Sequence, residues 1–461
     1  MVEQLRSVCP YDPSDVVVGF SETSSVQVEA VAAKALIAQR KWAASGAQAR
    51  SNALSAAAGA LESASEEVTS LATREVGKPR AEMRGEVARG VAILRYYAQA
   101  ALDPEGESLP STIPGGLTLT RRRPHGVVGL VTPWNFPVAI PIWKAAPALA
   151  YGNAVVLKPA PAATATALRL KELFDSCLPA DLFAVVPGDR ITGEAVVANT
   201  MAVSFTGSTT VGQSVIRTGA ARNIPVQAEM GGQNCSIVYP DANLATAASM
   251  VAAAAMGFAG QKCTATSRVI VVGDTGSFTD ALVSAIESLV IGDPSEADTV
   301  MGPVISDAAA RVVMDAREEA TASGGRVLTG GLDPGAARAG YFVPPTLVDG
   351  LAGEHRLAQV ETFGPFAVIL SARDDDDAIR LANGVRYGLV ASVFTSELDK
   401  ALWIGDRIAT GLFRVNAPTA GVDFHAPFGG IKDSSYGPRE QGKAARDFYT
   451  WTQTQAIAPS K

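Results

Sequence analysis

The sequence predicts an α/β protein built on parallel, doubly wound sheets. From Gly126 onward, short apolar runs alternate with segments of helical periodicity, as strands covered on both faces by crossover helices do. The chain has 461 residues, which at about 150 residues per domain suggests two to three domains. With 47% hydrophobic and 18% charged residues, disordered and fibrous classes are excluded.

The N-terminal third predicts helices followed by a hairpin. Residues 24–100 are rich in Ala, Glu, Leu and Arg at helical spacing, and Gly77–Pro79 is the one obvious break. Residues 104–125 are rich in Pro, Gly, Ser and Thr, and Leu117–Thr120 alternates like a strand. We expect a protruding hairpin there.

Two α/β series follow the hairpin. The first series has strands expected at 126–131, 154–158, 182–186, 203–206 and 226–229, with a helix at 138–150. Gly231 and Gly232 end this series and are expected to form an interdomain hinge. The second series has strands expected at 236–239, 267–272, 366–370 and 389–394 and a helix at 242–256. The acidic run 374–377 is expected to begin a helix, and the alternating tail 447–457 is expected to be a strand.

Charge and cysteine usage exclude several function classes. Lys plus Arg number 39 against 46 Asp plus Glu, so the net charge of −7 gives no electrostatic footprint for nucleic acid. The four cysteines and three histidines show no zinc-ligand spacing and no disulfide framework, so we expect no metal site. With no apolar run of about 20 residues and no signal-peptide pattern, we expect a cytoplasmic protein without a membrane partner.

Four segments carry candidate chemistry. Cys263 lies in a glycine-punctuated turn beside the cation Lys262, so a nucleophilic thiolate and an inert buried thiol are both open from local sequence. Glu229 ends a strand, where α/β sheets place ligands, or it is an exposed strand end. Asn135 is held between Pro133 and Pro137 and suits either an oxyanion donor or a plain turn. Glycines in the strand-to-helix turn 205–212 permit pyrophosphate binding, although the GxGxxG pattern is absent.

Taken together, these segments resemble the aldehyde dehydrogenase superfamily from about residue 12 to the C-terminus. The signatures occur in the family's order: Pro-Trp-Asn-Phe-Pro at 133–137, Lys-Pro at 158–159, Gly-Ser-Thr at 207–209, Glu-Met-Gly-Gly at 229–232, Gly-Gln-Lys-Cys at 260–263, Glu-Thr-Phe-Gly-Pro at 361–365, and Pro-Phe-Gly-Gly at 427–430. The resemblance implies a Rossmann-like cofactor domain (1–103 and 126–230), an α/β catalytic domain (231–440) and a small β oligomerisation element (104–125 and 441–461).

The resemblance also implies a covalent mechanism. Cys263 would add to the aldehyde as a thiolate and form a thiohemiacetal, whose oxyanion Asn135 and the Cys263 backbone N–H would stabilise. Glu229 would then activate the water that hydrolyses the thioester, with Lys144 and Glu440 as a proton relay behind it. Relatives that transfer the acyl group to coenzyme A generally lack this carboxylate, so Glu229 favours hydrolysis.

The cofactor implied by the resemblance is NAD or NADP. The expected contacts are Trp134, Lys158, Gly207, Ser208, Gly212, Glu361 and Phe363. NAD-preferring relatives often carry a Glu three residues after the lysine, and this chain has Pro161 there. Without that carboxylate the 2′-phosphate meets less repulsion, so we expect NADP to be accepted.

The substrate prediction is a semialdehyde. Stretches 143–153, 263–268 and 434–442 are most similar to the α-ketoglutarate semialdehyde (2,5-dioxopentanoate) type. The positions at which succinate semialdehyde dehydrogenases place arginines read Trp143 and Gly257, and the sequence shows no substitute cation. The pocket is expected to be apolar, lined by Phe136, Trp143, Phe258 and Phe424. Oxidation of a neutral or aromatic aldehyde, a catalytically silent member of the fold and a cofactor-free thiol esterase remain alternatives.

The prediction for assembly is a homodimer or a dimer of dimers. The hairpin near 117–121 and the tail strand would each expose unpaired backbone in a monomer. Joining the two across a twofold axis would satisfy both edges.

Overall fold

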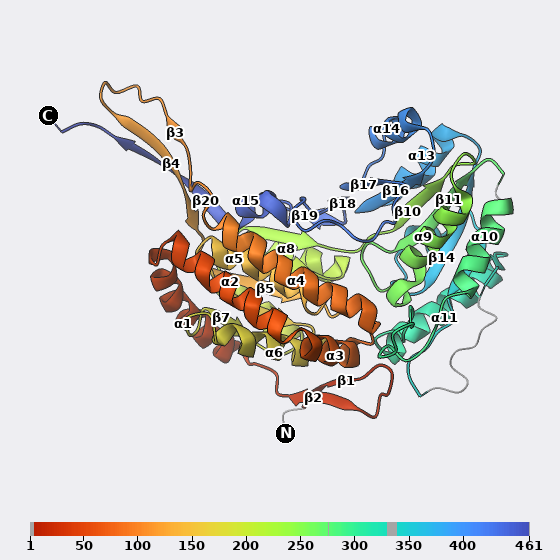
Figure 1. The fold of residues 1–461 in the computed structure, drawn as a ribbon, viewed down its shortest axis with the longest axis horizontal. Helices are drawn as coiled ribbons and strands as arrows, with labels where there is room; N and C mark the ends of the chain where they lie inside the picture. The colour runs from red at the N-terminus through yellow and green to blue at the C-terminus, as the bar shows by residue number, and fades with distance from the viewer. Residues whose placement is uncertain (1–3, 275, 330–338, 461) are drawn as a thin grey trace.

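The computed structural model describes residues 4–274, 276–329 and 339–460. These residues form two α/β lobes, a projecting three-stranded sheet and a small N-terminal hairpin (Figure 1). The hairpin pairs β1 (Leu5–Val8) with β2 (Val16–Phe20). The two lobes confirm the α/β class that the sequence predicts.

The first lobe contains a six-stranded sheet. Its strand order is β19-β9-β8-β5-β6-β7, and all pairs are parallel except that of β19 with β9. The chain runs outward from β5 through β6 and β7, then returns to the other side of β5 as β8. The order therefore reverses between β5 and β8, which is where ligands bind in such sheets. The strands are β5 (Val127–Thr132), β6 (Ala154–Pro159), β7 (Phe183–Val185), β8 (Ala202–Thr206), β9 (Val226–Glu229) and β19 (Ser435–Tyr436).

Helices cover both faces of this sheet. One face carries α5 (Ala139–Ala150) and α6 (Thr164–Asp175), with an outer layer of α2 (Ala47–Ser63), α3 (Ser65–Val76) and α4 (Arg80–Ala100). The other face carries α1 (Ser25–Ala44), α7 (Arg190–Asn199) and α8 (Thr209–Arg222). Every residue of α5 is buried because this helix lies between the sheet and α4. The predicted helical region 24–100 is confirmed, and Gly77 ends α3 with a left-handed φ of 70°.

The second lobe contains a seven-stranded sheet, parallel except for its edge strand β12. Helices α9 (Leu244–Met256) and α10 (Gly276–Glu287) pack on one face, and α13 (Asp375–Asn383) and α14 (Leu398–Gly405) on the other. Helix α11 (Asp307–Ala322) contacts β12, and α12 (Arg356–Gln359) precedes β14. The strand order is β12 (Arg326–Val327), β13 (Thr346–Asp349), β14 (Phe366–Ala372), β11 (Thr266–Val272), β10 (Asn234–Val238), β16 (Val390–Phe394) and β17 (Leu412–Val415).

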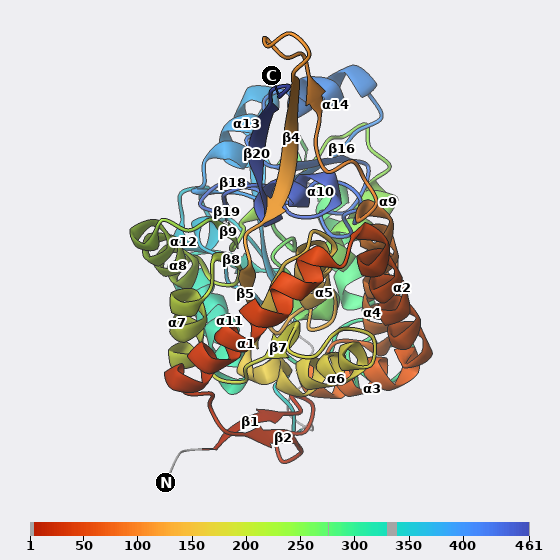
Figure 2. The same cartoon turned by 90° about the vertical axis from the view of Figure 1, so that its left-hand side faces the viewer.

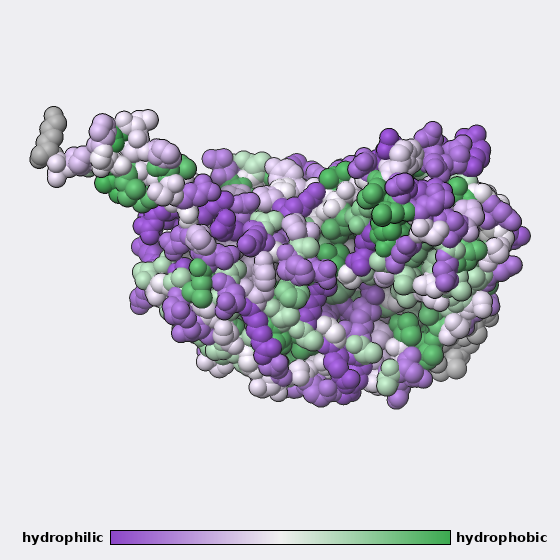
Figure 3. Space-filling model, turned by 45° about the horizontal axis from the view of Figure 1, so that its top comes forward, coloured by the Kyte–Doolittle hydropathy of each residue, from purple (hydrophilic) through white to green (hydrophobic). Residues whose placement is uncertain are grey.

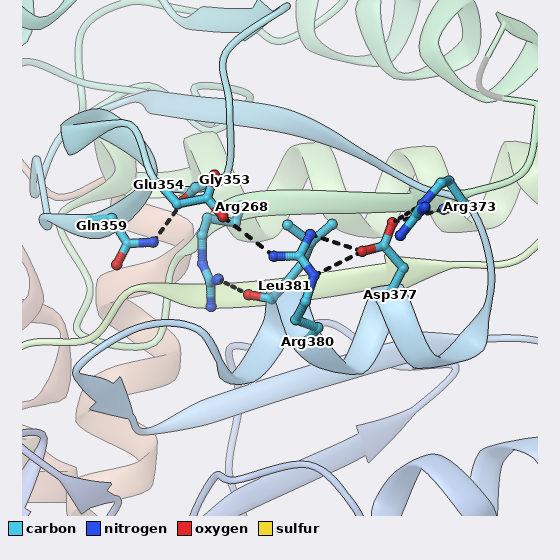
Figure 4. Close-up of polar contacts among 8 residues, drawn as sticks. All are labelled: Arg268, Gly353, Glu354, Gln359, Arg373, Asp377, Arg380 and Leu381. Atoms are coloured by element: carbon cyan, nitrogen blue, oxygen red, sulfur yellow. Dashed lines mark hydrogen bonds and ion pairs between the residues drawn. The ribbon is translucent and has the colours of Figure 1, made fainter.

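A buried arginine ties α13 to this sheet. The guanidinium of Arg268 donates to the carbonyl oxygen of Leu381 at 2.7 Å, in the last turn of α13 (Figure 4). It also donates to the carbonyl oxygens of Ala382 at 3.0 Å and Gln233 at 2.9 Å. At the other end of α13, Asp374 caps the helix, as the acidic run predicts. Arg268 therefore satisfies carbonyls that would otherwise be left unpaired.

The projecting sheet corrects the prediction that the hairpin and the tail strand pair across a twofold axis. The tail strand β20 (Thr450–Ile457) pairs antiparallel with β4 (Leu117–Pro124) of the same chain, and β3 (Ser108–Leu109) lies on the other side of β4. Figure 2 shows β4 and β20 side by side. The hairpin and the tail thus satisfy each other within one chain, and no twofold axis is needed to pair them. The tail prediction was also wrong at its start, because residues 445–449 form the helix α15 (Ala445–Tyr449).

One short strand departs from the predicted domain ranges. Strand β19 lies within the predicted catalytic domain, yet it extends the sheet of the first lobe, with Ser435 opposite Glu229. Nearby, β15 (Tyr387–Gly388) pairs with β18 (Ile431–Lys432). The segment 429–440 therefore crosses from the second lobe to the first. Among the described residues, no helix is long and apolar enough to cross a membrane.

Candidate active site

Asn135 lies in the turn that joins β5 to α5. Its side-chain Nδ2 donates to the backbone carbonyl of Gln261 at 2.9 Å, and the backbone carbonyl of Asn135 accepts from Lys78 Nζ at 3.0 Å. An amide nitrogen carries two N–H groups, so the Gln261 bond leaves one available. The turn places a fixed, buried donor at the carboxyl edge of the first sheet, next to the loop of Cys263.

The loop of Cys263 connects α9 to β11 and has a strained backbone. Phe258, Ala259 and Gly260 have left-handed φ values of 53°, 51° and 66° in succession. A Cβ on Gly260 would lie 2.1 Å from the carbonyl oxygen of Gly364, so only glycine fits there. Asn234 Nδ2 donates to the carbonyls of Cys263 and Ala265, both at 2.8 Å, and this fixes the loop to the start of β10. Strain of this kind is concentrated at functional sites.

The electrostatic surroundings of Cys263 differ from the prediction. Burial raises the pKa of its thiol, and the carboxylates of Glu361, Glu229 and Glu440 raise it further. The neighbouring cation Lys262 ion-pairs with Glu82 of α4 at 3.0 Å instead of pairing with the thiol. Sequence adjacency therefore does not make Lys262 the activating group, and the surroundings of the thiol favour its protonated form.

Glu229 lies at the end of β9 with its carboxylate buried. The Ser435 hydroxyl donates to Oε2, and a Cβ on Gly429 would lie 2.7 Å from Oε1. Burial raises the pKa of Glu229 well above its usual range, and Glu440 raises it further. The surroundings of Glu229 therefore favour the protonated carboxyl more than water does.

Lys144 and Glu440 form a buried pair behind Glu229. Lys144 Nζ contacts Glu440 Oε1 and donates to Ser204 Oγ at 2.7 Å, and Ser204 Oγ donates to Gln227 Oε1 at 2.9 Å. Within the part of the chain that the structure describes, Glu440 Oε2 has no hydrogen-bond partner. The arrangement brings together the three residues that the sequence predicts for proton transfer, and their roles stay a prediction.

The predicted contacts for the pyrophosphate and the adenosine ribose lie at the carboxyl ends of β8 and β6, beside the point where the strand order reverses. This edge of the sheet is called the crevice below. Gly207 and Ser208 lie between β8 and α8, where Ser208 caps the helix and the backbone N–H groups favour a phosphate. A Cβ on Gly212 would lie 2.5 Å from Met230 Sδ, so α8 packs closely only with glycine there. The hydroxyl of Thr206 is buried and, among the described residues, unpaired.

Lys158 on β6 is buried too. Burial lowers the pKa of its ammonium group, and the charges of Asp189 and Glu22 partly offset this decrease. These features fit a dinucleotide.

Glu361, Phe363 and Trp134 are the predicted contacts for the nicotinamide end of the cofactor. Glu361 Oε1 accepts from the backbone N–H of Gly232 at 3.2 Å, and burial raises its pKa to about 7. The rings of Trp134 and Phe363 meet edge to face with centroids 5.8 Å apart. Glu361 and Phe363 line a small hollow together with Gly260 and Lys262, so they lie against the loop of Cys263.

A cavity of about 450 Å³ opens at Cys263. Phe136 and Trp143 line it as predicted, whereas Phe258 and Phe424 are not among its lining residues and Phe428 is. Phe258 is instead enclosed between Lys78 and Trp134, and Phe424 packs on Tyr96. The cavity lies between the lobes, and Figure 3 shows this face of the molecule hollowed there.

The cavity wall also contains charges that the sequence analysis missed. Glu82, Glu86 and Arg89 of α4 line it, at helical spacing on one face of the helix. Lys78 lies beneath them, 2.6 Å from Glu86 and 3.4 Å from the centroid of the Phe136 ring. The signal in the sequence was the spacing of the charged residues at 78, 82, 86 and 89, which recur every three or four positions and so indicate one charged helix face. Across the described ranges, no group of three or more His, Cys, Asp or Glu side chains is arranged to hold a metal ion.

Comparison with known proteins agrees with this geometry. The sequence profile of the aldehyde dehydrogenase family matches residues 2–455. The chain is 41% identical to an alpha-ketoglutaric semialdehyde dehydrogenase of Bacillus subtilis, over 97% of this chain and 94% of the relative. It is 34% identical to a 2,5-dioxopentanoate dehydrogenase of Saccharolobus solfataricus, over 98% and 96% of the two chains. A crystal structure of betaine aldehyde dehydrogenase from Staphylococcus aureus in complex with NAD+ superposes with a TM-score of 0.95 at 28% identity, covering 100% of this chain and 93% of that one.

Proposed function

This chain belongs to the aldehyde dehydrogenase family, and we propose that it oxidises the aldehyde group of an oxo-acid semialdehyde of the 2,5-dioxopentanoate type to a carboxylate. The observation that carries the proposal is the position of Cys263 at a cavity between the two lobes. Asn135 is hydrogen-bonded to Gln261 of the Cys263 loop, and Glu229 lies near enough to raise the pKa of the Cys263 thiol. The names of the two semialdehyde-oxidising relatives support the substrate class.

In the first half of the proposed reaction, Cys263 forms a covalent bond to the substrate. Its thiol releases its proton to the solvent in the cavity, and the sulfur adds to the carbonyl carbon to give a thiohemiacetal. The amide of Asn135 and the backbone N–H of Cys263 donate to the oxygen, on which negative charge develops. A nicotinamide bound alongside supplies the acceptor for the hydride that leaves this carbon.

In the second half, water hydrolyses the thioester. Glu229 takes a proton from the attacking water, and the Cys263 sulfur leaves with the bond pair and is reprotonated. Lys144 and Glu440, the buried pair behind Glu229, carry the excess proton away from this carboxylate. Since a carboxylate is present for this step, hydrolysis is favoured over transfer to coenzyme A.

The residues of the crevice fit NAD, and we propose that NADP is accepted as well. Lys158 would bind the adenosine ribose, Gly207 and Ser208 the pyrophosphate, and Glu361 the nicotinamide ribose. Pro161 removes a carboxylate from the 2′-phosphate position. Glu22 and Asp189 act in the opposite direction, because both lie close enough to Lys158 to raise its pKa. Measuring kcat/KM with both cofactors tests this, and a hundredfold preference for NAD would overturn it.

A panel of aldehydes assayed at 340 nm tests the proposed activity. We expect 2,5-dioxopentanoate to give the highest kcat/KM, above succinate semialdehyde, pentanal and benzaldehyde. A higher kcat/KM for pentanal or benzaldehyde would favour the alternative of a neutral or aromatic substrate. No signal from any aldehyde with either cofactor would favour a catalytically silent member of the fold.

We also propose that the chain assembles as a homodimer or a dimer of dimers, in the cytoplasm. Among the described strands, β20 has one paired edge only, and its Trp451 and Ile457 are about half exposed. Exposed strand edges and apolar side chains of this kind favour association. Elution as a monomer in size-exclusion chromatography with light scattering would contradict the assembly.

A further inference from the structure

The wall of the Cys263 cavity that α4 forms carries two carboxylates and one guanidinium. Both carboxylates already have cationic partners. Glu82 ion-pairs with Lys262 at 3.0 Å and Lys78 at 3.7 Å. Glu86 ion-pairs with Lys78 at 2.6 Å and accepts from two backbone N–H groups, those of Val138 and Ala139, at 2.9 Å each. Their charge is therefore neutralised inside the protein.

Arg89 is the charged group of this wall that has no ion pair among the described residues. One Nη donates to the carbonyl of Val422, which is neutral and which also lines the cavity. Its Nε is inaccessible to solvent and, in the described part of the chain, has no hydrogen-bond partner. Arg89 is partly exposed, and burial lowers its pKa, an effect that the charges of Glu86 and Asp423 partly offset. A guanidinium fork of this kind binds a carboxylate with two parallel hydrogen bonds.

Two further donors in the same cavity lack partners. The indole Nε1 of Trp143 is buried and unpaired within the described ranges. The side-chain amide of Gln441, whose residue is 1% exposed, is likewise unpaired at both its nitrogen and its oxygen. Neutral donors of this kind suit a ketone oxygen, which only accepts hydrogen bonds.

We propose that Arg89 binds the distal carboxylate of the aldehyde substrate and that Trp143 and Gln441 donate to the oxo group next to it. This inference rests on the proposed function and extends it by naming the specificity-determining residues. It also corrects the expectation of an apolar pocket without a cation, since the fold supplies from α4 the cation that the two usual positions lack.

Substitution of Arg89 tests the carboxylate contact. The substrates are 2,5-dioxopentanoate, glutarate semialdehyde, which lacks the oxo group, and pentanal, which lacks both groups. For Arg89→Gln we expect KM to rise roughly 10- to 100-fold for both acids with kcat nearly unchanged, since a hydrogen bond to a charged group is lost. Pentanal oxidation should stay at the wild-type level, and Arg89→Lys should recover part of the loss. The matched control is Arg95→Gln, an exposed arginine of the same helix that pairs with Glu62.

Conservative substitution of Trp143 tests the oxo contact. Trp143→Phe keeps an aromatic ring and removes the N–H group. We expect KM to rise several-fold for 2,5-dioxopentanoate and to stay unchanged for glutarate semialdehyde. Equal changes for both acids would overturn the assignment of Trp143.

An inhibition assay separates failure of this inference from failure of the proposed function. Glutarate should inhibit wild-type pentanal oxidation competitively against pentanal and should inhibit Arg89→Gln at least tenfold more weakly. If the wild type prefers pentanal to both acids, the proposed function fails, yet Arg89-dependent inhibition by glutarate would still support the carboxylate site. Equal losses for acids and pentanal in Arg89→Gln, unchanged KM for the acids, or inhibition that is absent or independent of Arg89 would overturn the assignment of Arg89.

Discussion

The ammonium group of Lys78 and the carboxylate of Glu86 lie 2.6 Å apart in the protein interior, and both side chains are inaccessible to solvent. Lys78 also donates to the backbone carbonyl of Asn135, and Glu86 accepts from the backbone N–H groups of Val138 and Ala139 at the start of α5. This ion pair therefore links the start of α4 to the turn that carries the proposed oxyanion donor. Its role in stability leads to the first prediction.

Breaking the Lys78–Glu86 pair should destabilise the protein strongly. Replacing one partner, as in Lys78→Met, leaves the other charge buried and unpaired, which typically costs about 3–5 kcal/mol. The free energy of unfolding from urea titration measures this loss. The double variant Lys78→Met/Glu86→Met should recover part of it, because no lone charge remains. Single variants as stable as the wild type would contradict the prediction.

Replacement of Cys263 should abolish oxidation without removing the cofactor site. We expect Cys263→Ala to lose all measurable NADH formation, because no covalent intermediate can form, and to bind NADH with wild-type affinity in a fluorescence titration. Cys177→Ala is the control, since Cys177 is a free cysteine two residues after the end of α6, outside the cavity. Turnover by Cys263→Ala would refute the mechanism.

Replacement of Asn135 should slow the chemical step. Loss of one oxyanion donor typically lowers kcat by about 10²–10³-fold, so Asn135→Ala should show this decrease with a KM close to that of the wild type. Because Asn135 also holds the Gln261 carbonyl, urea unfolding should be measured in parallel. A kcat within threefold of the wild type would argue against the role of this amide.

Replacement of Glu229 should separate oxidation from hydrolysis. We expect Glu229→Gln to give a burst of NADH followed by a slow steady state, with the acyl group on Cys263 visible by mass spectrometry. Burial raises the pKa of Glu229, so the wild-type steady-state rate should rise with pH as the carboxylate ionises, and the variant should lose this rise. Ser435→Ala removes a hydrogen bond that lowers this pKa and should shift the profile to higher pH. A variant with neither burst nor adduct would contradict the assignment.

The buried carboxyl of Glu361 should make stability depend on pH. Its pKa in the folded protein is about 7, above the value of about 4.3 in the unfolded chain. The folded state therefore holds a proton that the unfolded state releases, and this contribution to stability falls as pH rises from about 4.3 to about 7. Glu361→Gln should remove the decrease, so the variant should gain stability relative to the wild type at pH 8 by up to about 4 kcal/mol. Identical pH dependence of the two proteins would rule this out.

The architecture was predictable because buried parallel strands have a distinct composition. The runs at 126–131 and 154–158 are continuously apolar, since helices cover both faces of the sheet, and they form β5 and β6 within one or two residues of the predicted bounds. The family resemblance rested on short motifs, and the family profile, which matches residues 2–455, confirms the family.

Sequence patterns were a poorer guide to pairing across long distances. The alternation at 450–457 indicates a strand with two different faces, but it does not name the partner. The structure pairs this strand with β4 of the same chain. In the same way, Lys262 is adjacent to Cys263 in sequence, yet its ammonium group points to Glu82, about 180 residues earlier.

The sequence by itself determined the α/β class, because buried strands and helices differ in local composition. It also determined the family and the candidate cysteine, amide and carboxylate, because short motifs that resemble the aldehyde dehydrogenase family contain them. Only the tertiary structure decided which charges face the cavity. Arg89 lies in an ordinary amphipathic helix, and its exposure to the space around Cys263 depends on how α4 packs against α5 and against the loop of Val422. Helical periodicity shows which residues share a face, whereas the partner of that face follows from packing over the whole chain.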